Sequence, residues 1–281
     1  MDINAFKTFL EVAKTRHFGR AANNLCVTQS AVSARIKALE ESLGAELFIR
    51  ERSNIHLSPS GEALVIHASS IVDMWNRARQ EVSLPNGMQY SLNVGGLPGL
   101  WDILLQDWLN QVLLAQPDLA MNADIYSADV LVEKVLNRSI DLAFFYDAPH
   151  SPQLTSQIFS KINLRLVSSN PDVSIDDAIQ DRYIYVDWGT YFGVQHAAAF
   201  PSSSIAKLYT SSGRIAFEAI KANGGAAYLA EPMVRSAVQR GEISYVADAP
   251  VFERAAYAVF HQSSNKAEFV TQLLQDSLMQ D

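Results

Sequence analysis

The chain has 281 residues, 48% hydrophobic and 19% charged, a balance typical of a globular protein with two or three domains. Its single cysteine excludes an intramolecular disulfide and a site with several thiolates, and its six histidines are too scattered to predict a metal site. The sequence has no apolar run of the roughly 18 residues that a membrane span needs, and its N-terminus does not resemble a secretory signal. We therefore expect a cytoplasmic protein with no membrane contact.

The formal net charge of −8 is distributed unevenly along the chain. Residues 1–57 contain eight Lys and Arg against six Asp and Glu, which gives +2 and leaves −10 for the remainder. Attraction to phosphate depends on local charge rather than on the total. An acidic body that carries a mildly basic N-terminal part is therefore compatible with DNA binding.

The most informative segment, residues 16–40, has the pattern of two short helices joined by a tight turn. The second helix has an apolar stripe at helical spacing, formed by Val32, Ile36 and Leu39. Thr28 is suited to cap this helix because its hydroxyl can accept a backbone N–H of the first turn. Cys26 lies in the turn, where we expect a small buried side chain rather than a redox sensor. The pattern predicts a helix-turn-helix.

The outer face of the second helix is polar, which suits hydrogen bonding to base edges and phosphates. Gln can bond to adenine through two hydrogen bonds, whereas Arg favours guanine or phosphate. The residues expected to contact double-stranded DNA are Gln29, Ser30, Ser33, Arg35, Lys37 and Arg52. The alternative is a solvated helix face that has no ligand.

A helix near residues 3–13 should pack against this pair, and residues 43–57 predict a two-stranded wing with its tip at Ser53–Asn54. Ser58–Pro59 marks the start of a long helix that runs to about Val82. Apolar residues at alternating steps of four and three form a stripe along it: Leu64, Ala68, Ile71, Trp75, Ala78 and Val82. We expect this stripe to pair with a second copy of the helix. Packing on its own domain is the alternative.

Residues 84–89 contain Pro85 and Gly87 and are expected to form a hinge. From residue 90 onward, predicted strands alternate with predicted helices, which is typical of βαβ units with mostly parallel sheets. The expected strands are Ser91–Val94, Ala123–Tyr126, Leu142–Tyr146, Leu164–Ser168, Tyr183–Val186, Ala226–Leu229 and Tyr257–Phe260. The expected helices are Trp101–Leu114, Val130–Asn137, Ser174–Ile179, Gly213–Ala222, Met233–Arg240 and Ala267–Met279. The length fits two small α/β subdomains joined by crossover strands.

The N-terminal part resembles the LysR-type transcriptional regulators. The motifs that carry the resemblance are Phe9–Ala13, Phe18–Ala22, Thr28–Ser33, Ile36–Glu40, Leu47–Arg50 and Leu57–Glu62. The segments 15–20 and 187–189 resemble one subgroup of this family. The resemblance implies an α/β protein that assembles as a homotetramer. Its implied parts are a winged helix-turn-helix at 1–58, a linker and dimerisation helix at 59–83, the hinge at 84–89, and an effector domain of two periplasmic-binding-protein-like lobes at 90–281.

The resemblance further implies that a small, anionic effector binds in the cleft between the lobes, where hydroxyl groups and helix N-termini receive it. The residues expected at this site are Gly96, Leu97, Ser127, Tyr146, Trp188, Thr210 and Ser211. The alternative is a cleft filled by its own side chains, in a regulator that signals only through its oligomeric state.

The sequence contains none of the motifs Gly-x-Ser-x-Gly, His-Glu-x-x-His, Gly-x-Gly-x-x-Gly or a phosphate-binding loop, so we expect neither an enzyme nor a cofactor. A solute-binding protein would share the two lobes but would not need a recognition helix. A purely architectural DNA-binding protein would not need the large α/β body. We therefore expect an allosteric regulator of promoters.

Overall fold

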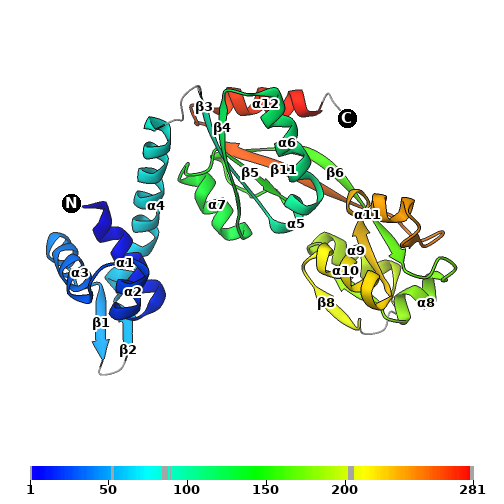
Figure 1. Cartoon of the computed structure of the whole chain (residues 1–281), viewed down its shortest axis with the longest axis horizontal. Helices are drawn as coiled ribbons and strands as arrows, with labels where there is room; N and C mark the ends of the chain where they lie inside the picture. Colours follow the sequence, from blue (N-terminus) through cyan, green and yellow to red (C-terminus); the bar gives the residue numbers. More distant parts are fainter. Residues whose placement is uncertain (1, 52–53, 84–87, 89, 202–205, 279–281) are drawn as a thin grey trace. The chain divides into compact units, whose positions relative to one another are not determined.

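The computed structural model describes residues 2–51, 54–83, 88, 90–201 and 206–278 (Figure 1). The chain divides into two compact units, Met1–Ser91 and Leu92–Asp281. The predicted hinge at 84–89 lies outside the described residues except for Met88. Within the described ranges, no helix is both long and apolar enough to cross a membrane.

The first unit consists of a helical head, a hairpin and a long helix (Figure 1). Its elements are α1 (Ile3–Thr15), α2 (Phe18–Asn24), α3 (Gln29–Leu43), β1 (Phe48–Glu51), β2 (Asn54–Leu57) and α4 (Pro59–Val82). The two strands pair antiparallel from Phe48 opposite Leu57 to Glu51 opposite Asn54, which confirms the predicted wing. Ser53, expected at its tip, lies outside the described residues.

Helix α1 contacts α2, α3 and α4, which confirms that a first helix packs against the predicted pair. The predicted stripe of α3 is buried: Val32, Ile36 and Leu39 are at most 2% exposed. The ring of Phe9 in α1 lies 5.4 Å from the ring of Phe48 in β1. The wing is therefore attached to the same apolar core as the three helices.

The turn between α2 and α3 corrects the expectation for Cys26, which is exposed and has a φ of 53°. The N–H of Val27 donates to the carbonyl of Ala22 at 3.0 Å, and the N–H of Cys26 donates to the carbonyl of Asn23 at 3.1 Å. This pair of hydrogen bonds is a Schellman motif, in which the residue with positive φ is usually glycine. The positive φ of Cys26, rather than burial of its side chain, therefore determines which residue types suit this position.

Helix α4 uses its predicted apolar stripe in two ways. Ala68 is fully buried and Leu64 packs against the core of the head, so the first part of the stripe covers its own unit, as in the alternative. Farther along, Ile71, Trp75 and Val82 are 39%, 47% and 87% exposed. The part of the stripe beyond Ala68 is thus exposed on the first unit.

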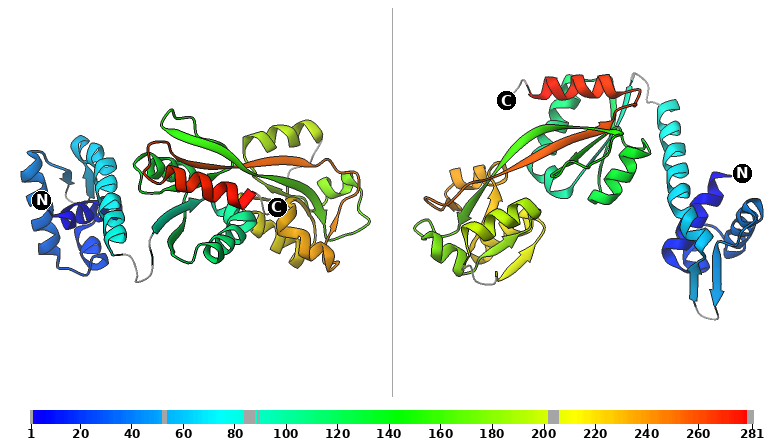
Figure 2. Two further views of the ribbon diagram at one scale, coloured as in Figure 1. Left: turned by 90° about the horizontal axis from the view of Figure 1, so that it is seen from above. Right: turned by 180° about the vertical axis from the view of Figure 1, so that it is seen from behind.

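The second unit has two lobes joined by two long strands (Figures 1 and 2). The first lobe contains β3 (Tyr90–Gly96), α5 (Pro98–Leu100), η1 (Trp101–Leu105), α6 (Gln106–Ala115), β4 (Leu119–Ile125), α7 (Ala128–Leu136), β5 (Leu142–Phe145) and α12 (Ala267–Leu278). The second lobe contains α8 (Ile175–Gln180), β7 (Ile184–Val186), α9 (Thr190–Ala199), β8 (Leu208–Thr210), α10 (Gly213–Asn223), β9 (Ala226–Ala230), α11 (Glu231–Gln239) and β10 (Ser244–Tyr245). The joining strands are β6 (Leu154–Ser168) and β11 (Phe252–His261).

The strand order of the main sheet is β10-β6-β11-β5-β3-β4, and β9 also pairs with β6. Strands β3 and β5 are parallel, as are β7 and β8. The joining strands instead pair antiparallel with each other, from Phe252 opposite Leu164 to His261 opposite Leu154, and both views of Figure 2 show them side by side. The expectation of mostly parallel sheets is therefore wrong for the strands that join the lobes, although crossover strands themselves were predicted.

Helix α9 and strand β8 were not predicted from the sequence. Helix α9 follows Gly189 and contains aromatic and β-branched residues among small ones, without a clear apolar stripe. Strand β8 has three residues and is paired only by the similarly short β7. Neither element has a strong local signal, because its conformation depends on the rest of the lobe.

Replacing Cys26 with glycine should stabilise the head. Glycine adopts positive φ without a Cβ clash, but it loses more chain entropy on folding, so we expect a net gain of about 0.5–1 kcal/mol. Hydrogen exchange of peptides from α2 and α3 should become slower by the corresponding factor. Cys26→Ala is the matched control, because it removes the thiol but keeps the Cβ; equal protection in both variants would contradict this explanation.

Candidate DNA interface and effector site

Helix α3 presents a polar face to solvent. Gln29, Ser33 and Lys37 are spaced by four residues and so lie on one side of the helix, with Ser30 next to them. Gln29, Ser30 and Lys37 are exposed and Ser33 is half-buried. Lys37 lies 3.6 Å from the Glu41 carboxylate, a contact that solvent screens strongly because both side chains are exposed. Four of the predicted DNA contacts are thus brought together.

Arg35 lies on a different side of α3. It follows Val32 by three residues and precedes Leu39 by four, so it borders the buried stripe rather than the polar face. Its Nη1 donates to the hydroxyl of Thr8 in α1 at 3.3 Å, and its side chain is half-buried. The structure therefore does not bring Arg35 together with the other predicted contacts.

Local hydrogen bonds fix the position of α3. The Thr28 hydroxyl accepts the N–H of Ala31 at 3.2 Å, which confirms the predicted N-cap. At the other end, the carboxylate of Glu40 accepts the N–H of Leu47 at 2.8 Å, directly before β1. The wing and the polar face are thereby held in one arrangement. The predicted contact Arg52 lies outside the described residues.

Five of the seven predicted effector residues are not in the lining of the cavity that the other two share. Gly96 is buried, and a Cβ on it would lie 2.8 Å from the indole nitrogen of Trp101. Trp188 is 3% exposed, and its Nε1 donates to the carbonyl of Tyr228 at 2.9 Å. The remaining three are Leu97, Ser127 and Tyr146. Trp188 is thus part of the core of the second lobe rather than of an open cleft wall.

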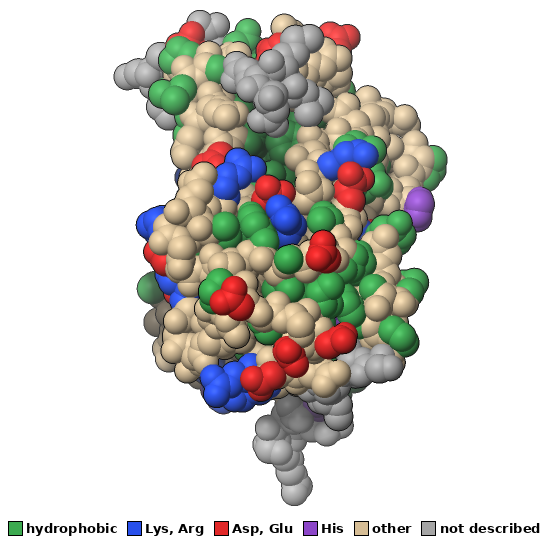
Figure 3. Space-filling model, turned by 90° about the vertical axis from the view of Figure 1, so that its right-hand side faces the viewer, with side chains coloured by type: hydrophobic (Ala, Val, Ile, Leu, Met, Phe, Trp, Pro, Cys, Tyr) green, Lys and Arg blue, Asp and Glu red, His purple; other side chains and the backbone are tan. Residues whose placement is uncertain are grey.

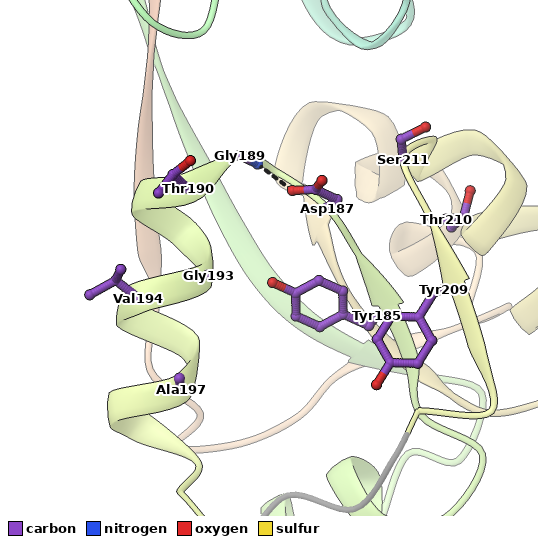
Figure 4. Close-up of a pocket in the computed structure, with 10 residues that line it drawn as sticks. All are labelled: Tyr185, Asp187, Gly189, Thr190, Gly193, Val194, Ala197, Tyr209, Thr210 and Ser211. Carbon is purple, nitrogen blue, oxygen red and sulfur yellow. Dashed lines mark hydrogen bonds between the residues drawn. The ribbon is translucent and has the colours of Figure 1, made fainter.

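The other two, Thr210 and Ser211, line a cavity of about 790 Å³ in the second lobe, between α9 and the strands β7 and β8 (Figure 4). Most of the lining was not predicted from the sequence. It also comprises Tyr185, Asp187, Gly189, Thr190, Gly193, Val194, Ala197 and Tyr209. Asp187 supplies the only formal charge in this described lining. At this end of the lining the backbone N–H of Ser212 is not free for an anion, because it donates to the hydroxyl oxygen of Thr210 at 3.1 Å.

Helix α9, one wall of the cavity, is anchored by His196. This residue is 5% exposed, and its Nε2 lies 2.7 Å from the hydroxyl of Tyr183, whose ring stacks on the imidazole. Burial lowers the pKa of His196 below its ordinary value of 6.5. The neutral imidazole is therefore the form that the folded lobe favours.

Side chains from both lobes meet at the junction between them. The ring of Tyr146, which directly follows β5, lies 6.3 Å from that of Trp188 at a steep angle. Arg254 in β11 bonds to Asp147 with both terminal nitrogens and to the carbonyl of Trp188 with Nε. No sequence motif points to Arg254, because its partners are distant in the chain.

The surface of the second unit differs from the polar face of α3. The face in Figure 3 carries acidic and basic side chains around an apolar area, and its described residues form no continuous basic surface. A winged helix-turn-helix head with a two-lobed α/β unit defines a class of protein, the DNA-binding transcriptional regulators.

Comparison with known proteins identifies the family. The model of bacterial regulatory helix-turn-helix proteins of the lysR family matches residues 3–62, and that of the LysR substrate binding domain matches residues 85–278. The chain is 36% identical over 284 residues to the transcriptional regulator HdfR of Yersinia enterocolitica, covering 98% of this chain and 95% of that protein. HdfR of Yersinia pseudotuberculosis matches with the same identity and coverage. The protein belongs to the LysR family of DNA-binding transcriptional regulators.

Solved structures support the fold. CbnR, a LysR family regulator, has a TM-score of 0.74 at 17% identity, covering 99% of both chains. Full-length CbnR in complex with its target DNA has a TM-score of 0.73 at 18% identity, covering 99% of this chain and 100% of that one. The predicted family, its HdfR-like subgroup and the two-part fold are confirmed. The expectation of a regulator rather than an enzyme agrees with these relatives.

The stability of the second lobe should depend on pH through His196. The pKa of His196 in the folded lobe lies below 6.5, so below pH 6.5 the unfolded chain binds a proton that the folded lobe does not bind. The contribution of His196 to the free energy of unfolding is therefore complete above pH 6.5 and is lost as the pH falls through the folded pKa. In urea unfolding, His196→Gln should lose less stability than the wild type between pH 7.5 and pH 5.5. The control is His150→Gln, at an exposed position. Equal losses in wild type and His196→Gln would refute this role.

Proposed function

We propose that this protein binds promoter DNA sequence-specifically through the polar face of α3, with Gln29, Ser30, Ser33 and Lys37 reading base edges and neighbouring phosphates. The observation that carries this proposal is that these side chains share one side of a capped helix, with Gln29, Ser30 and Lys37 exposed and Ser33 half-buried. Gln and Ser hydrogen-bond to base edges, and an ammonium group attracts phosphate. CbnR, of similar fold, has been solved with its target DNA.

Arg35 and Arg52 are proposed as phosphate contacts. For Arg35 this requires its guanidinium to leave the hydroxyl of Thr8, a neutral acceptor at 3.3 Å. A hydrogen bond to a charged phosphate is stronger than one to a neutral hydroxyl, so DNA can compete for this donor.

We further propose a homodimer formed through α4, which assembles into a homotetramer. The support is the exposed part of the stripe, since Ile71, Trp75 and Val82 are large apolar side chains exposed on the first unit. Such a dimer would present two α3 helices to two half-sites. Because promoters lie with the chromosome, we propose a cytoplasmic location.

The second unit is proposed to bind a small effector and to change DNA binding by altering how its lobes pack. A ligand can do this only if its affinity differs between the two arrangements. The contacts that Tyr146, Trp188 and Arg254 make at the junction of the lobes favour the second candidate, a regulator that signals by oligomeric state alone. The cavity beside α9 favours the first.

Removing Gln29 should reduce specific DNA binding. Gln29→Ala should weaken binding to the protein's own upstream promoter by about 1–3 kcal/mol, with non-specific binding unchanged, because a bond to a base edge is lost. Fluorescence anisotropy against specific and scrambled duplexes measures both affinities. Gln239→Ala, at an exposed position in the second unit, is the matched control. Equal weakening on both duplexes would show that Gln29 does not read bases.

Lys37 and Arg35 should act on phosphates. In each alanine variant the slope of log affinity against log salt should become shallower by about 0.9 per head, because fewer counterions are released. The same binding assay at several salt concentrations measures this slope. An unchanged slope for Arg35→Ala would place its guanidinium permanently on Thr8.

A charge in the exposed stripe should separate the dimer. Trp75→Glu buries a carboxylate in the proposed interface, so we expect assemblies smaller than the wild-type homotetramer in sedimentation velocity and weaker binding to paired half-sites. Ile66→Glu is the control, because Ile66 is 61% exposed but lies on another side of α4. A Trp75→Glu protein that keeps the wild-type mass would exclude this interface.

A further inference from the structure

The ring of His17 is fixed by the backbone of α2. Its Nδ1 accepts the N–H of Gly19 at 3.0 Å and the N–H of Arg20 at 3.2 Å. An imidazole nitrogen that accepts hydrogen bonds carries no proton, so the proton of the neutral ring lies on Nε2. These two N–H groups of α2 are thus already bonded, and the donor that the ring presents is Nε2.

This donor faces no acceptor within the head. The side chain of His17 is exposed, and among the described residues its Nε2 has no hydrogen-bond partner. The carboxylate of Glu11, the nearest acidic residue along the chain, accepts instead from the side-chain amide of Asn24 at 2.7 Å. Two bonds to Nδ1 already set the direction of the ring, so little side-chain entropy is lost when Nε2 binds an acceptor outside the chain.

The ring of His17 lies beside Gln29, the first residue of α3. A Cβ on Gly19 would lie 3.0 Å from Cε1 of His17 and 3.6 Å from Oε1 of Gln29. Both side chains therefore border one small space, which glycine leaves open. In a helix-turn-helix the recognition helix enters the major groove, and the helix before it crosses the sugar-phosphate backbone. This geometry places His17 at the backbone when Gln29 is at the bases.

The sequence around His17 favours an anionic partner. Residues 12–39 contain five Lys and Arg and no Asp or Glu. Three of these cations, Lys14, Arg16 and Arg20, lie within three residues of His17, and all three are exposed. Such a segment attracts the phosphates of DNA.

We propose that His17 is a DNA contact, in which its Nε2–H donates to a backbone phosphate beside the bases that Gln29 reads. The inference rests on the proposed binding of promoter DNA through α3, and it adds a residue that lies outside that helix. Because the donor is neutral, the contact fixes the position of the head on the duplex without releasing a counterion. One ring thereby connects the backbone of α2 to the phosphate.

Two substitutions separate the two roles of the ring. In His17→Asn the side-chain oxygen takes the place of Nδ1 and keeps the cap of α2, but no atom reaches the position of Nε2. In His17→Gln the amide reaches the position of Nε2 and can donate, but no acceptor remains at the position of Nδ1. His150→Asn, at an exposed position in the second unit, is the matched control.

The test measures fluorescence anisotropy of the full-length proteins on promoter and scrambled duplexes. We expect His17→Asn to bind both duplexes at least about tenfold more weakly, because a bond to a charged acceptor is lost and phosphates are present in every sequence. Hydrogen exchange in α2 should match that of the wild type. His17→Gln should show the opposite pattern, with faster exchange in α2 and a smaller loss of affinity.

Salt dependence and modified duplexes identify the contact. The slope of log affinity against log salt should be the same in His17→Asn and wild type, because no charge is removed. Duplexes in which an uncharged methylphosphonate replaces one phosphate at a time locate the acceptor. At one position in each half-site the replacement should weaken the wild type more than His17→Asn, which is the signature of two groups in contact.

Four results would overturn the proposal. They are wild-type affinity in His17→Asn, an affinity loss that follows the exchange of α2 across the two variants, a salt slope shallower by about 0.9 per head in His17→Asn, and no phosphate position that distinguishes this variant from wild type. The second would leave His17 only as a cap, and the third would require a charged ring.

The same measurements separate this contact from the proposed function. A wild type that binds promoter and scrambled duplexes equally would contradict sequence-specific binding through α3. A wild type that prefers its promoter, together with a His17→Asn protein of equal affinity, would contradict the His17 contact alone.

Discussion

The antiparallel pairing of β6 with β11 is the contact on which the second unit depends. Each strand continues from one lobe into the other: β5 of the first lobe pairs with β11, and β9 of the second lobe pairs with β6. The register shifts between Ala256 and Tyr257, and such an irregularity bends and twists a strand locally. Any difference in lobe orientation must pass through these two strands. Arg254 lies two residues before the shift, so its bonds are made close to the point where the strands bend.

A comparable sharing of one element occurs in the first unit. Helix α4 covers the core of the head with Ala68 and exposes Trp75 less than two turns later. One apolar stripe therefore forms both a buried contact with the head and an exposed surface. Its alternating spacing alone could not indicate where the buried contact ends. Because the buried part fixes α4 on α1, a partner bound to the exposed part would be held rigidly relative to α3.

The sequence predicted features that local chemistry determines and failed where distant residues decide. Thr28 caps α3 and the stripe at Val32 is buried because a cap and a helical period are local properties. Arg35 was expected beside Lys37, yet its position next to the buried stripe and the hydroxyl of Thr8 turn it toward α1. Trp188 was expected in a cleft, but the carbonyl of Tyr228 and the core of the second lobe hold it inside. No property of the sequence near Arg254 indicated Asp147 as its partner.

Arg35 and Arg254 each have an internal hydrogen-bond partner, and the two interactions differ in strength. Arg35 donates one hydrogen bond to the neutral hydroxyl of Thr8, whereas Arg254 donates two to a carboxylate. A neutral bond contributes about 0.5–1.5 kcal/mol and a bond to a charged group about 1.5–3 kcal/mol. The bond of Arg35 is therefore the easier of the two to exchange, and a phosphate could replace the Thr8 hydroxyl at small cost. The two bonds of Arg254 instead hold Asp147 at the junction of the lobes, where they help to fix the arrangement of β11 and the segment after β5.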